Sequence, residues 1–207
     1  MIIAVDGPTA SGKGTIAKQL AAHFGLPCLD TGLLYRAVGY QTWLNGGDFD
    51  NEADAVAACA FPDELLDNPE LRSEETGGYA SRISIHPGVR RALFERQRAF
   101  AEQPGGAVLD GRDIGTVIAP DADVKLFITA SVQERARRRW LEMTGREIEI
   151  PLAEIEKDVA ARDARDINRK DAPLQAAPDA MVIDTTAFDK EQAFSAILEA
   201  VNGALEG

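Results

Sequence analysis

A stretch near the N-terminus, residues 6–15, has the residue types and the spacing of a loop that binds phosphate. Gly7 and Gly12 are separated by four residues, and Lys13 directly follows the second glycine. Glycines at this spacing let successive backbone N–H groups point at one anion, while the lysine reaches the outer phosphates of a nucleotide. We prefer this interpretation to a glycine turn beside a surface lysine because a strand-like apolar run precedes the loop and a helical pattern follows it. The residues expected to bind the nucleotide are Gly7, Pro8, Thr9, Ala10, Ser11, Gly12, Lys13, Gly14 and Thr15.

The position after Lys13 departs from the general pattern of such loops. The pattern has Ser or Thr there as a magnesium ligand, whereas this chain has Gly14, with a hydroxyl one residue later at Thr15. We therefore expect Mg²⁺ to be held mainly by nucleotide phosphates and water, with Thr15 turned toward an inner phosphate. Asp110 directly follows the predicted strand 107–109, from where a carboxylate can hold the water shell of the metal. A capping aspartate is the alternative role for Asp110.

Further charged residues are placed to surround a transferred phosphate. Arg112 and Asp113 follow Asp110 on the same predicted sheet edge, and we expect them to contact substrate rather than to be surface charges. The helix predicted over 131–145 carries four arginines, too many to face one direction at about 100° per residue. Because phosphoryl transfer needs positive charge on the transferred group, we expect one or two of them to close over it as a lid. The four are Arg135, Arg137, Arg138 and Arg139.

Three charged residues near position 165 have the spacing of one helical face. Arg162, Asp166 and Arg169 stand at i, i+4 and i+7, which places them together if the predicted helix extends that far. Their spacing is compatible with two roles, substrate binding and a ladder of ion pairs.

The two histidines, His23 and His86, have no partner in the sequence that suggests a general base. A kinase that acts on an alcohol usually places a base at the hydroxyl, but a phosphate acceptor is already ionised at pH 7. We therefore expect the acceptor to carry a phosphate group.

The order of predicted elements indicates how these residues are positioned. Strands alternate with helices, which predicts one α/β domain whose parallel sheet is covered by helices. The carboxyl ends of the strands then form one rim, where doubly wound sheets bind ligands. Residues 48–85 are irregular, rich in acids and interrupted by prolines, and are predicted to be an insertion beside the sheet. The five strands are predicted at 2–5, 27–30, 107–109, 124–128 and 181–184.

Length and composition exclude several classes of protein. The 207 residues suffice for one domain with a full core, and the net charge of -12 argues against nucleic acid or an anionic membrane as partner. No run reaches the roughly 20 apolar residues of a membrane span, and the N-terminus lacks the basic segment of a signal peptide, so we expect a cytoplasmic protein. Cys28 and Cys59 have no metal spacing and are not expected to form a disulfide. We expect a monomer, because the predicted helices lack an obvious exposed apolar patch.

Four motifs, in order along nearly the whole chain, resemble those of bacterial cytidylate kinases. The resemblance implies the three-layer α/β fold of P-loop NTPases, with a five-stranded parallel sheet, and transfer of the γ-phosphate of ATP to CMP or dCMP with Mg²⁺. It also implies a core of residues 1–47, 87–133 and 170–207, a CMP-binding insertion at 48–86 and a small arginine-rich lid at 134–169. The motifs are G-P-x-x-x-G-K-G-T after Asp6, Leu29-Asp30-Thr31-Gly32 with Tyr35-Arg36, Asp110-Gly111-Arg112-Asp113 with Gly115-Thr116, and Arg162-Asp163-x-Arg165-Asp166-x-Asn168-Arg169.

Carried over position by position, the resemblance implies a role for each matching residue. The CMP phosphate would be gripped by Tyr35, Arg36 and Arg112. The cytosine would be surrounded by Thr31, Ser81, Arg90 and Asp113, and the ribose would be held by Arg162 and Asp166. The residues around the transferred phosphate would be Lys13, Arg112, Arg138 and Arg169, with Asp110 and Thr15 supporting the metal through water.

Three features depart from the family pattern. Thr31 stands where serine is common, and Ala10 replaces a common glycine. Residues 48–80 are too short, too acidic and too poor in β-branched residues for the family's small antiparallel sheet, so we expect a trimmed insertion. Two other functions remain open: a kinase for another small acceptor, such as a different nucleoside monophosphate or shikimate, and a nucleotide-binding regulator that does not turn over. The chain lacks the Asn-Lys-x-Asp motif that reads guanine, which weakens the second of these.

Overall fold

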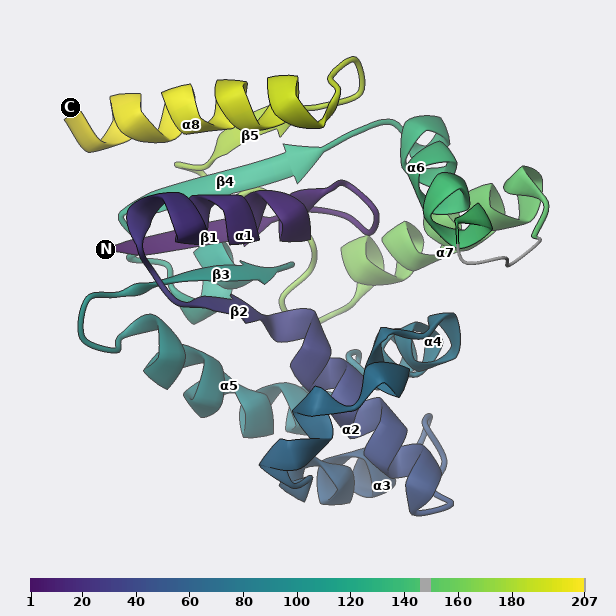
Figure 1. Ribbon diagram of the computed structural model, residues 1–207. Helices are drawn as coiled ribbons and strands as arrows, with labels where there is room; N and C mark the ends of the chain where they lie inside the picture. Colours follow the sequence, from purple (N-terminus) through teal and green to yellow (C-terminus); the bar gives the residue numbers. More distant parts are fainter. Residues whose placement is uncertain (146–149, 207) are drawn as a thin grey trace.

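The computed structural model describes residues 1–145 and 150–206, and it has a parallel sheet with helices on both faces (Figure 1). The strands lie in the order β2-β3-β1-β4-β5, and every neighbouring pair is parallel. All carboxyl ends therefore meet at one edge, and the predicted three-layer fold class is confirmed. The strands are β1 (Ile2–Asp6), β2 (Cys28–Asp30), β3 (Ala107–Gly111), β4 (Val124–Thr129) and β5 (Met181–Asp184).

Burial on both faces explains why the central strands are continuous apolar runs in the sequence. In β1, Ile3 and Val5 pack on one face with residues of α1 and α8, whereas Ala4 faces α5 and the turn η4 on the other. At the sheet edge, by contrast, Val182 of β5 is 61% exposed. The covering elements are α1 (Lys13–Phe24), α5 (Pro87–Ala101), η4 (Ile114–Ile118) and α8 (Lys190–Glu206).

The segment 48–86 folds beside the sheet as short helices that pack on α2 (Thr31–Leu44). Leu34 and Val38 of α2 share a buried core with Leu71 and Ile83 of this segment. The segment contains no strand, so helices take the place of the small antiparallel sheet that the family pattern would require. Its elements are α3 (Glu52–Ala57), η1 (Ala58–Ala60), η2 (Asp63–Asp67), η3 (Pro69–Arg72) and α4 (Glu74–Ile83).

Two helices, α6 (Val132–Thr144) and α7 (Leu152–Asn168), pack against each other beyond the carboxyl ends of the strands (Figure 1). Ala136 and Met143 meet Ile155 and Val159 in their shared core. The two helices belong to the predicted lid region 134–169, of which residues 146–149 lie outside the described residues.

Some local predictions are wrong in detail. Strand β3 extends through Gly111, so Asp110 lies inside the strand rather than after it. The spacing of Ser131 and Glu134 predicts a capping box at the start of α6, but this box is only half formed. Oγ of Ser131 accepts from Glu134 N at 3.2 Å, whereas the Glu134 carboxylate binds neighbouring arginines of α6 instead of reaching back. The helical pattern after Pro151 predicts an inward Leu152, but this residue is 41% exposed. None of the helices in the described part of the chain is long and apolar enough to cross a membrane.

Candidate active site

The phosphate loop joins the end of β1 to the start of α1, as predicted. Gly7 and Gly12 have φ angles of 152° and 88°, which favour glycine. A Cβ at Gly7 would lie 2.1 Å from the backbone oxygen of Ile128 in β4, so the loop approaches the sheet too closely for any side chain there. Ala10, which stands where the family commonly has glycine, adopts a left-handed φ of 57°.

Lys13 and Asp110 face each other beneath this loop. Nζ of Lys13 lies 3.6 Å from Oδ1 of Asp110, and both side chains are buried. Burial lowers the pKa of Lys13 and raises the pKa of Asp110, while the attraction between the two charges counters both shifts. A Cβ at Gly14 would lie 2.9 Å from Oδ2 of Asp110, so serine or threonine at this position would press against the carboxylate. The glycine that departs from the general loop pattern therefore makes room for Asp110.

The surroundings of Asp110 fit a magnesium ion that is held mostly by other ligands. Its buried Oδ1 has no hydrogen-bond partner in the described part of the chain. Asp30 of β2 is its register partner and lines the same cavity as Thr15. Within residues 1–145 and 150–206, no three His, Cys, Asp or Glu side chains are grouped to hold a metal. A carboxylate oxygen that makes no hydrogen bond beside a phosphate loop suits Mg²⁺, which keeps several waters and binds substrate phosphates.

A buried network of arginines and aspartates lies across from the loop. The Asp113 carboxylate forms an ion pair with Arg90 of α5 and lies 3.7 Å from Nη2 of Arg169. Asp166 accepts from Nε of Arg112 at 2.9 Å and lies 4.0 Å from Nη1 of Arg169. The spacing of Arg162, Asp166 and Arg169 predicted one helical face, but α7 ends at Asn168 and Arg169 follows it in an extended conformation. This turn directs Arg169 between the two aspartates.

Two further arginines lie against α4. Arg36 donates from Nη1 to the backbone oxygens of Leu71 and Ser73, at 2.8 Å each. A Cβ at Gly77 of α4 would lie 2.6 Å from Nη2 of Arg162 and 2.8 Å from Nη2 of Arg36, so this glycine lets both guanidinium groups approach the helix. Burial and the neighbouring arginines lower the pKa of Arg162 to about 10. Such a concentration of half-buried positive charge suits a phosphate.

The smaller side chains of the predicted site lie among these charges. Thr31 donates from Oγ1 to the backbone oxygen of Asp110 at 2.8 Å. The guanidinium of Arg90 lies over the Tyr35 ring, 5.7 Å from its centroid. Oγ of Ser81 is buried and has no hydrogen-bond partner in the described residues, so it is available to a ligand.

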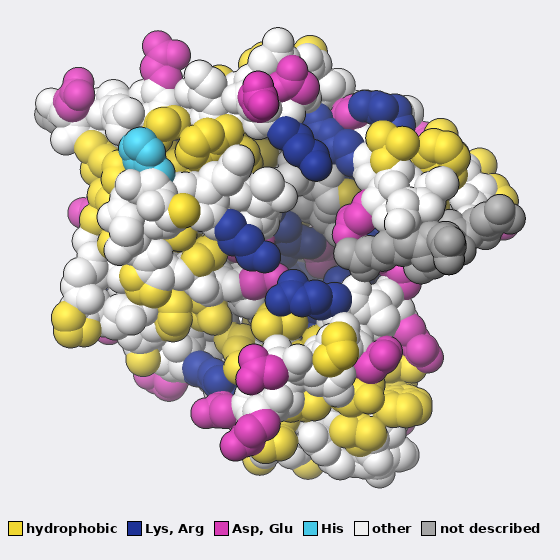
Figure 2. Space-filling model, in the orientation of Figure 1, with side chains coloured by type: hydrophobic (Ala, Val, Ile, Leu, Met, Phe, Trp, Pro, Cys, Tyr) yellow, Lys and Arg dark blue, Asp and Glu magenta, His cyan; other side chains and the backbone are white. Residues whose placement is uncertain are grey.

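These groups line one cavity of about 410 Å³ over the carboxyl ends of β2, β3 and β1. Figure 2 shows Lys and Arg side chains gathered around a hollow on this face. The predicted residues brought together there are Thr9, Ala10, Gly12, Lys13, Gly14, Thr15, Thr31, Tyr35, Arg36, Ser81, Arg90, Asp110, Arg112, Asp113, Arg162, Asp166 and Arg169. Gly7, Pro8, Ser11 and Arg138 were also predicted but are not among the lining residues.

The arginines of α6 take different directions. Arg135 is buried and donates to the backbone oxygen of Thr9 at 3.0 Å, while Arg137 is largely exposed beside Glu134. Arg138 donates from Nη2 to the backbone oxygen of Thr185 at 2.6 Å and from Nη1 to the backbone oxygen of Ser11 at 3.4 Å, so it joins the loop to the backbone after β5. Arg139 lines the cavity. Sequence reasoning did not assign Arg139 to the cavity, because no local signal separates the four.

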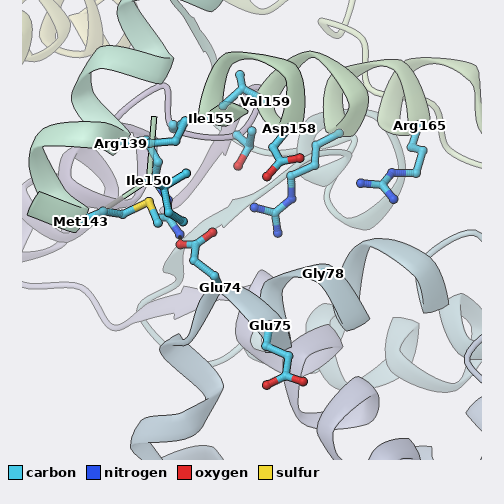
Figure 3. A pocket seen from close by; sticks show the side chains of 13 residues that line it. Glu74, Glu75, Gly78, Arg139, Met143, Ile150, Ile155, Asp158, Val159 and Arg165 are labelled. Atoms are coloured by element: carbon cyan, nitrogen blue, oxygen red, sulfur yellow. Dashed lines mark ion pairs between the residues drawn. The ribbon is translucent and has the colours of Figure 1, made fainter. Parts of the chain in front are cut away.

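A second cavity of about 300 Å³ lies between α4 and the pair α6 and α7 (Figure 3). Glu74 of α4 points across it and forms an ion pair with Arg139. Apolar side chains of Met143, Ile150 and Ile155 line the same side as Arg139. The insertion and the lid region therefore meet directly above the phosphate loop.

The lining residues that the sequence analysis missed include Asp30 and Lys18. Asp30 ends β2 in register with Asp110, and the same strand-end argument could have found it. Lys18 lies on the first helix after the loop and lines the cavity, but one surface lysine carries no distinguishing pattern.

Comparison with known proteins places the chain in a family. A family model described as cytidylate kinase matches residues 3–203. A protein named cytidylate kinase from Methylocella silvestris is 53% identical over 205 residues, which are 99% of this chain and 95% of that protein. One of the same name from Xanthobacter autotrophicus is 51% identical over 207 residues and all of both chains.

Solved structures agree on the fold alone, because their sequences are distant. An uncharacterized protein from Eubacterium ventriosum has a TM-score of 0.55 at 15% identity, covering 98% of each chain. A protein from Thermus thermophilus has a TM-score of 0.50 at 21% identity, covering 100% of this chain and 98% of the other. The fold, the cavity and the match to the family model along almost the whole sequence agree: the chain belongs to the cytidylate kinase family.

Proposed function

We propose that the chain transfers the γ-phosphate of ATP to CMP and to dCMP, giving ADP and CDP or dCDP. The observation that carries this proposal is one cavity in which the phosphate loop faces the buried network around Asp113. A donor phosphate bound at the loop and an acceptor bound at the network would then lie across a common space. Relatives named cytidylate kinase over the full length support CMP as the acceptor.

ATP binds at the phosphate loop in this proposal. Backbone N–H groups of residues 7–15 would surround its inner phosphates, and Lys13 would reach the outer ones. Asp110, with Thr15 nearby, would hold the water shell of Mg²⁺. When bound, the ion supplies charge neutralisation at the phosphate oxygens. Arg138, which spans the loop and the backbone after β5, would hold the donor side in place.

The acceptor binds on the opposite wall. Tyr35, Arg36 and Arg112 would grip the CMP phosphate, since guanidinium groups donate to phosphate in a fork. Arg162 and Asp166 would hold the ribose, with Arg162 also close enough to Arg36 to add positive charge at the phosphate.

Recognition of cytosine follows from a donor and an acceptor placed together. The base would be surrounded by Thr31, Ser81, Arg90 and Asp113. A carboxylate accepts from the cytosine amino group and a guanidinium donates to its carbonyl edge, whereas uracil presents a carbonyl where cytosine presents the amino group. Ser81 and Arg90 come from α4 and α5, and Thr31 and Asp113 follow β2 and β3.

Transfer itself requires positioning and charge rather than a general base. The acceptor phosphate is ionised at pH 7. Neither histidine lines the cavity, because His23 is exposed and Nε2 of His86 lies 2.8 Å from the backbone oxygen of Phe49. Nη2 of Arg169 is buried without a hydrogen-bond partner in the described residues. Lys13, Arg112 and Arg169 would stabilise the charge of the transferred group.

Movement of two parts would close the site. The segment 48–86 and the helices α6 and α7 carry walls of the cavity, and the ion pair between Glu74 and Arg139 already links them. We propose that both parts tighten around bound nucleotides, which would exclude water from the transferred phosphate. The enzyme would act as a monomer without nucleic acid.

A coupled assay of ADP release tests the proposal. ATP and Mg²⁺ are supplied with CMP, dCMP, UMP, AMP or shikimate in parallel. We expect turnover that depends on CMP or dCMP and is much slower with the other three. Preference for another acceptor would overturn the choice of substrate, and no acceptor-dependent release would overturn the assignment as a kinase.

A further inference from the structure

We propose that Asp6, the last residue of β1, is a positioning residue that holds the acceptor segment Arg112–Asp113 in place. The inference rests on the proposed function, in which that segment contacts CMP. Asp6 itself does not line the cavity, so its action on substrate is indirect.

The geometry is a bidentate contact between distant parts of the chain. Oδ1 of Asp6 accepts from Ile114 N and Oδ2 accepts from Gly115 N, both at 2.8 Å. These two N–H groups belong to the first residues of η4, the turn that directly follows Arg112 and Asp113. Asp6 therefore satisfies the donors that the start of a helical turn leaves free.

Asp113 would ordinarily supply that cap itself. It occupies the N-cap position of η4, where an aspartate commonly accepts from the following N–H groups, but its side chain makes no such bond. Its carboxylate is instead paired with Arg90 and lies near Arg169. By capping η4 from β1, Asp6 leaves the Asp113 carboxylate free for the substrate network.

The Asp6 side chain is buried without a cationic partner in the described part of the chain, which costs free energy of folding. The residue is 4% exposed, and among the described residues no lysine or arginine nitrogen lies within ion-pair distance of it. Burial raises the pKa of Asp6 to about 7; the two backbone N–H groups lower it, and the charges of Asp113 and Asp110 raise it. A buried carboxylate without a cation is unfavourable unless its hydrogen bonds are needed.

Asp6 also connects the two halves of the site. The next residue, Gly7, begins the phosphate loop, so Asp6 ends the strand directly before the donor loop and also fixes the acceptor segment. Loss of its hydrogen bonds should therefore loosen Arg112 and Asp113 while leaving the path of the loop, which Gly7 holds against β4, unchanged.

The test compares Asp6→Asn and Asp6→Ala with a matched control, Asp123→Asn. Oδ2 of Asp123 accepts from Ile2 N at 2.7 Å, so the control removes a similar carboxylate contact at the opposite end of β1. We expect D6N to raise KM for CMP by about tenfold, equivalent to one lost hydrogen bond to a charged group, and D6A to raise it further. KM for ATP should change less than about twofold in both, and D123N should alter neither constant.

Each outcome decides between this role and others. The inference would be overturned if D6N left KM for CMP unchanged. It would also be overturned if D6N raised KM for CMP and KM for ATP equally, which would indicate a general structural role. If D6A does not fold, the D6N measurement decides, because asparagine keeps one acceptor oxygen in the same volume. Failure of the unmodified protein to use CMP would instead refute the proposed function.

Discussion

Asp113 is the acid on which two buried arginines converge, so removal of its charge should disturb both stability and substrate choice. The side chains of Asp113, Arg90 and Arg169 are 7%, 10% and 4% exposed. Removing one partner of such a buried pair costs about 3–5 kcal/mol. Because asparagine keeps an oxygen that can accept from Arg90, we expect Asp113→Asn to cost about 3 kcal/mol, the lower end of that range. For a chain of this length the Tm would fall by about 6–12 °C.

Chemical unfolding of four proteins measures this coupling directly: the unmodified chain, D113N, Arg90→Met and the double variant. Since Arg90→Met removes a cation whose anionic partner is already gone in D113N, the double variant should be more stable than the sum of the single losses predicts, by about 1 kcal/mol or more. Asp63→Asn is the control, because Asp63 pairs with Arg96 at 2.8 Å and the two side chains are 80% and 40% exposed. It should cost at most about 1 kcal/mol.

The same variants test recognition of the base. We expect D113N to lower the ratio of kcat/KM for CMP over UMP by tenfold or more, roughly the effect of one mismatched polar contact. KM for ATP should stay near its normal value. Strictly additive single and double losses, together with unchanged discrimination, would refute the account of Asp113 as the centre of the acceptor site.

Three other perturbations follow from the structure. Asp110→Asn should raise the Mg²⁺ concentration for half-maximal activity by about 10- to 100-fold, and an unchanged Mg²⁺ requirement would contradict metal support by Asp110. Because the pKa of Asp6 is raised from 3.8 to about 7, the folded state keeps a proton on Asp6 that the unfolded state has lost. The contribution of Asp6 to the free energy of unfolding should therefore fall by up to about 4 kcal/mol between pH 4 and pH 7. In urea unfolding, the free energy of unfolding of D6N should fall less between these pH values than that of the unmodified chain. An identical pH dependence of the two proteins would contradict the raised pKa of Asp6. Gly7→Ala should lower the free energy of unfolding by at least about 2 kcal/mol, because the new Cβ would meet the Ile128 oxygen. The control Gly78→Ala, whose Cβ would meet no atom within 4 Å, should change it by less than about 1 kcal/mol. Equal effects of the two substitutions in thermal unfolding would contradict the packing argument.

Features that depend on local chain geometry could be predicted from the sequence. A strand buried on both faces must be apolar throughout, which is why the sequence pattern predicted β1 from Ile2 onward. The loop between β1 and α1 was visible because only glycine tolerates the backbone at Gly7 and Gly12. The strand ends then predicted that Asp110 and Arg112 share one edge, and the structure places both in the cavity.

Features that depend on contacts between distant segments could not be predicted. The four arginines of α6 look alike in sequence, but their partners are fixed by the loop at Thr9, the backbone after β5 and Glu74 of α4. The contact of Asp6 with η4 joins residues more than a hundred positions apart, and no spacing signals it. The position of Arg169 depends on where α7 ends, which the helical periodicity leaves undetermined.

The central claim is that the protein transfers a phosphoryl group from ATP to CMP within this cavity. The most direct measurement is phosphorus NMR of a mixture of the protein, ATP, Mg²⁺ and CMP. The account predicts that signals of ADP and CDP grow together in equal amounts as those of ATP and CMP decline. Formation of inorganic phosphate without CDP, or no change in the CMP signal, would contradict it.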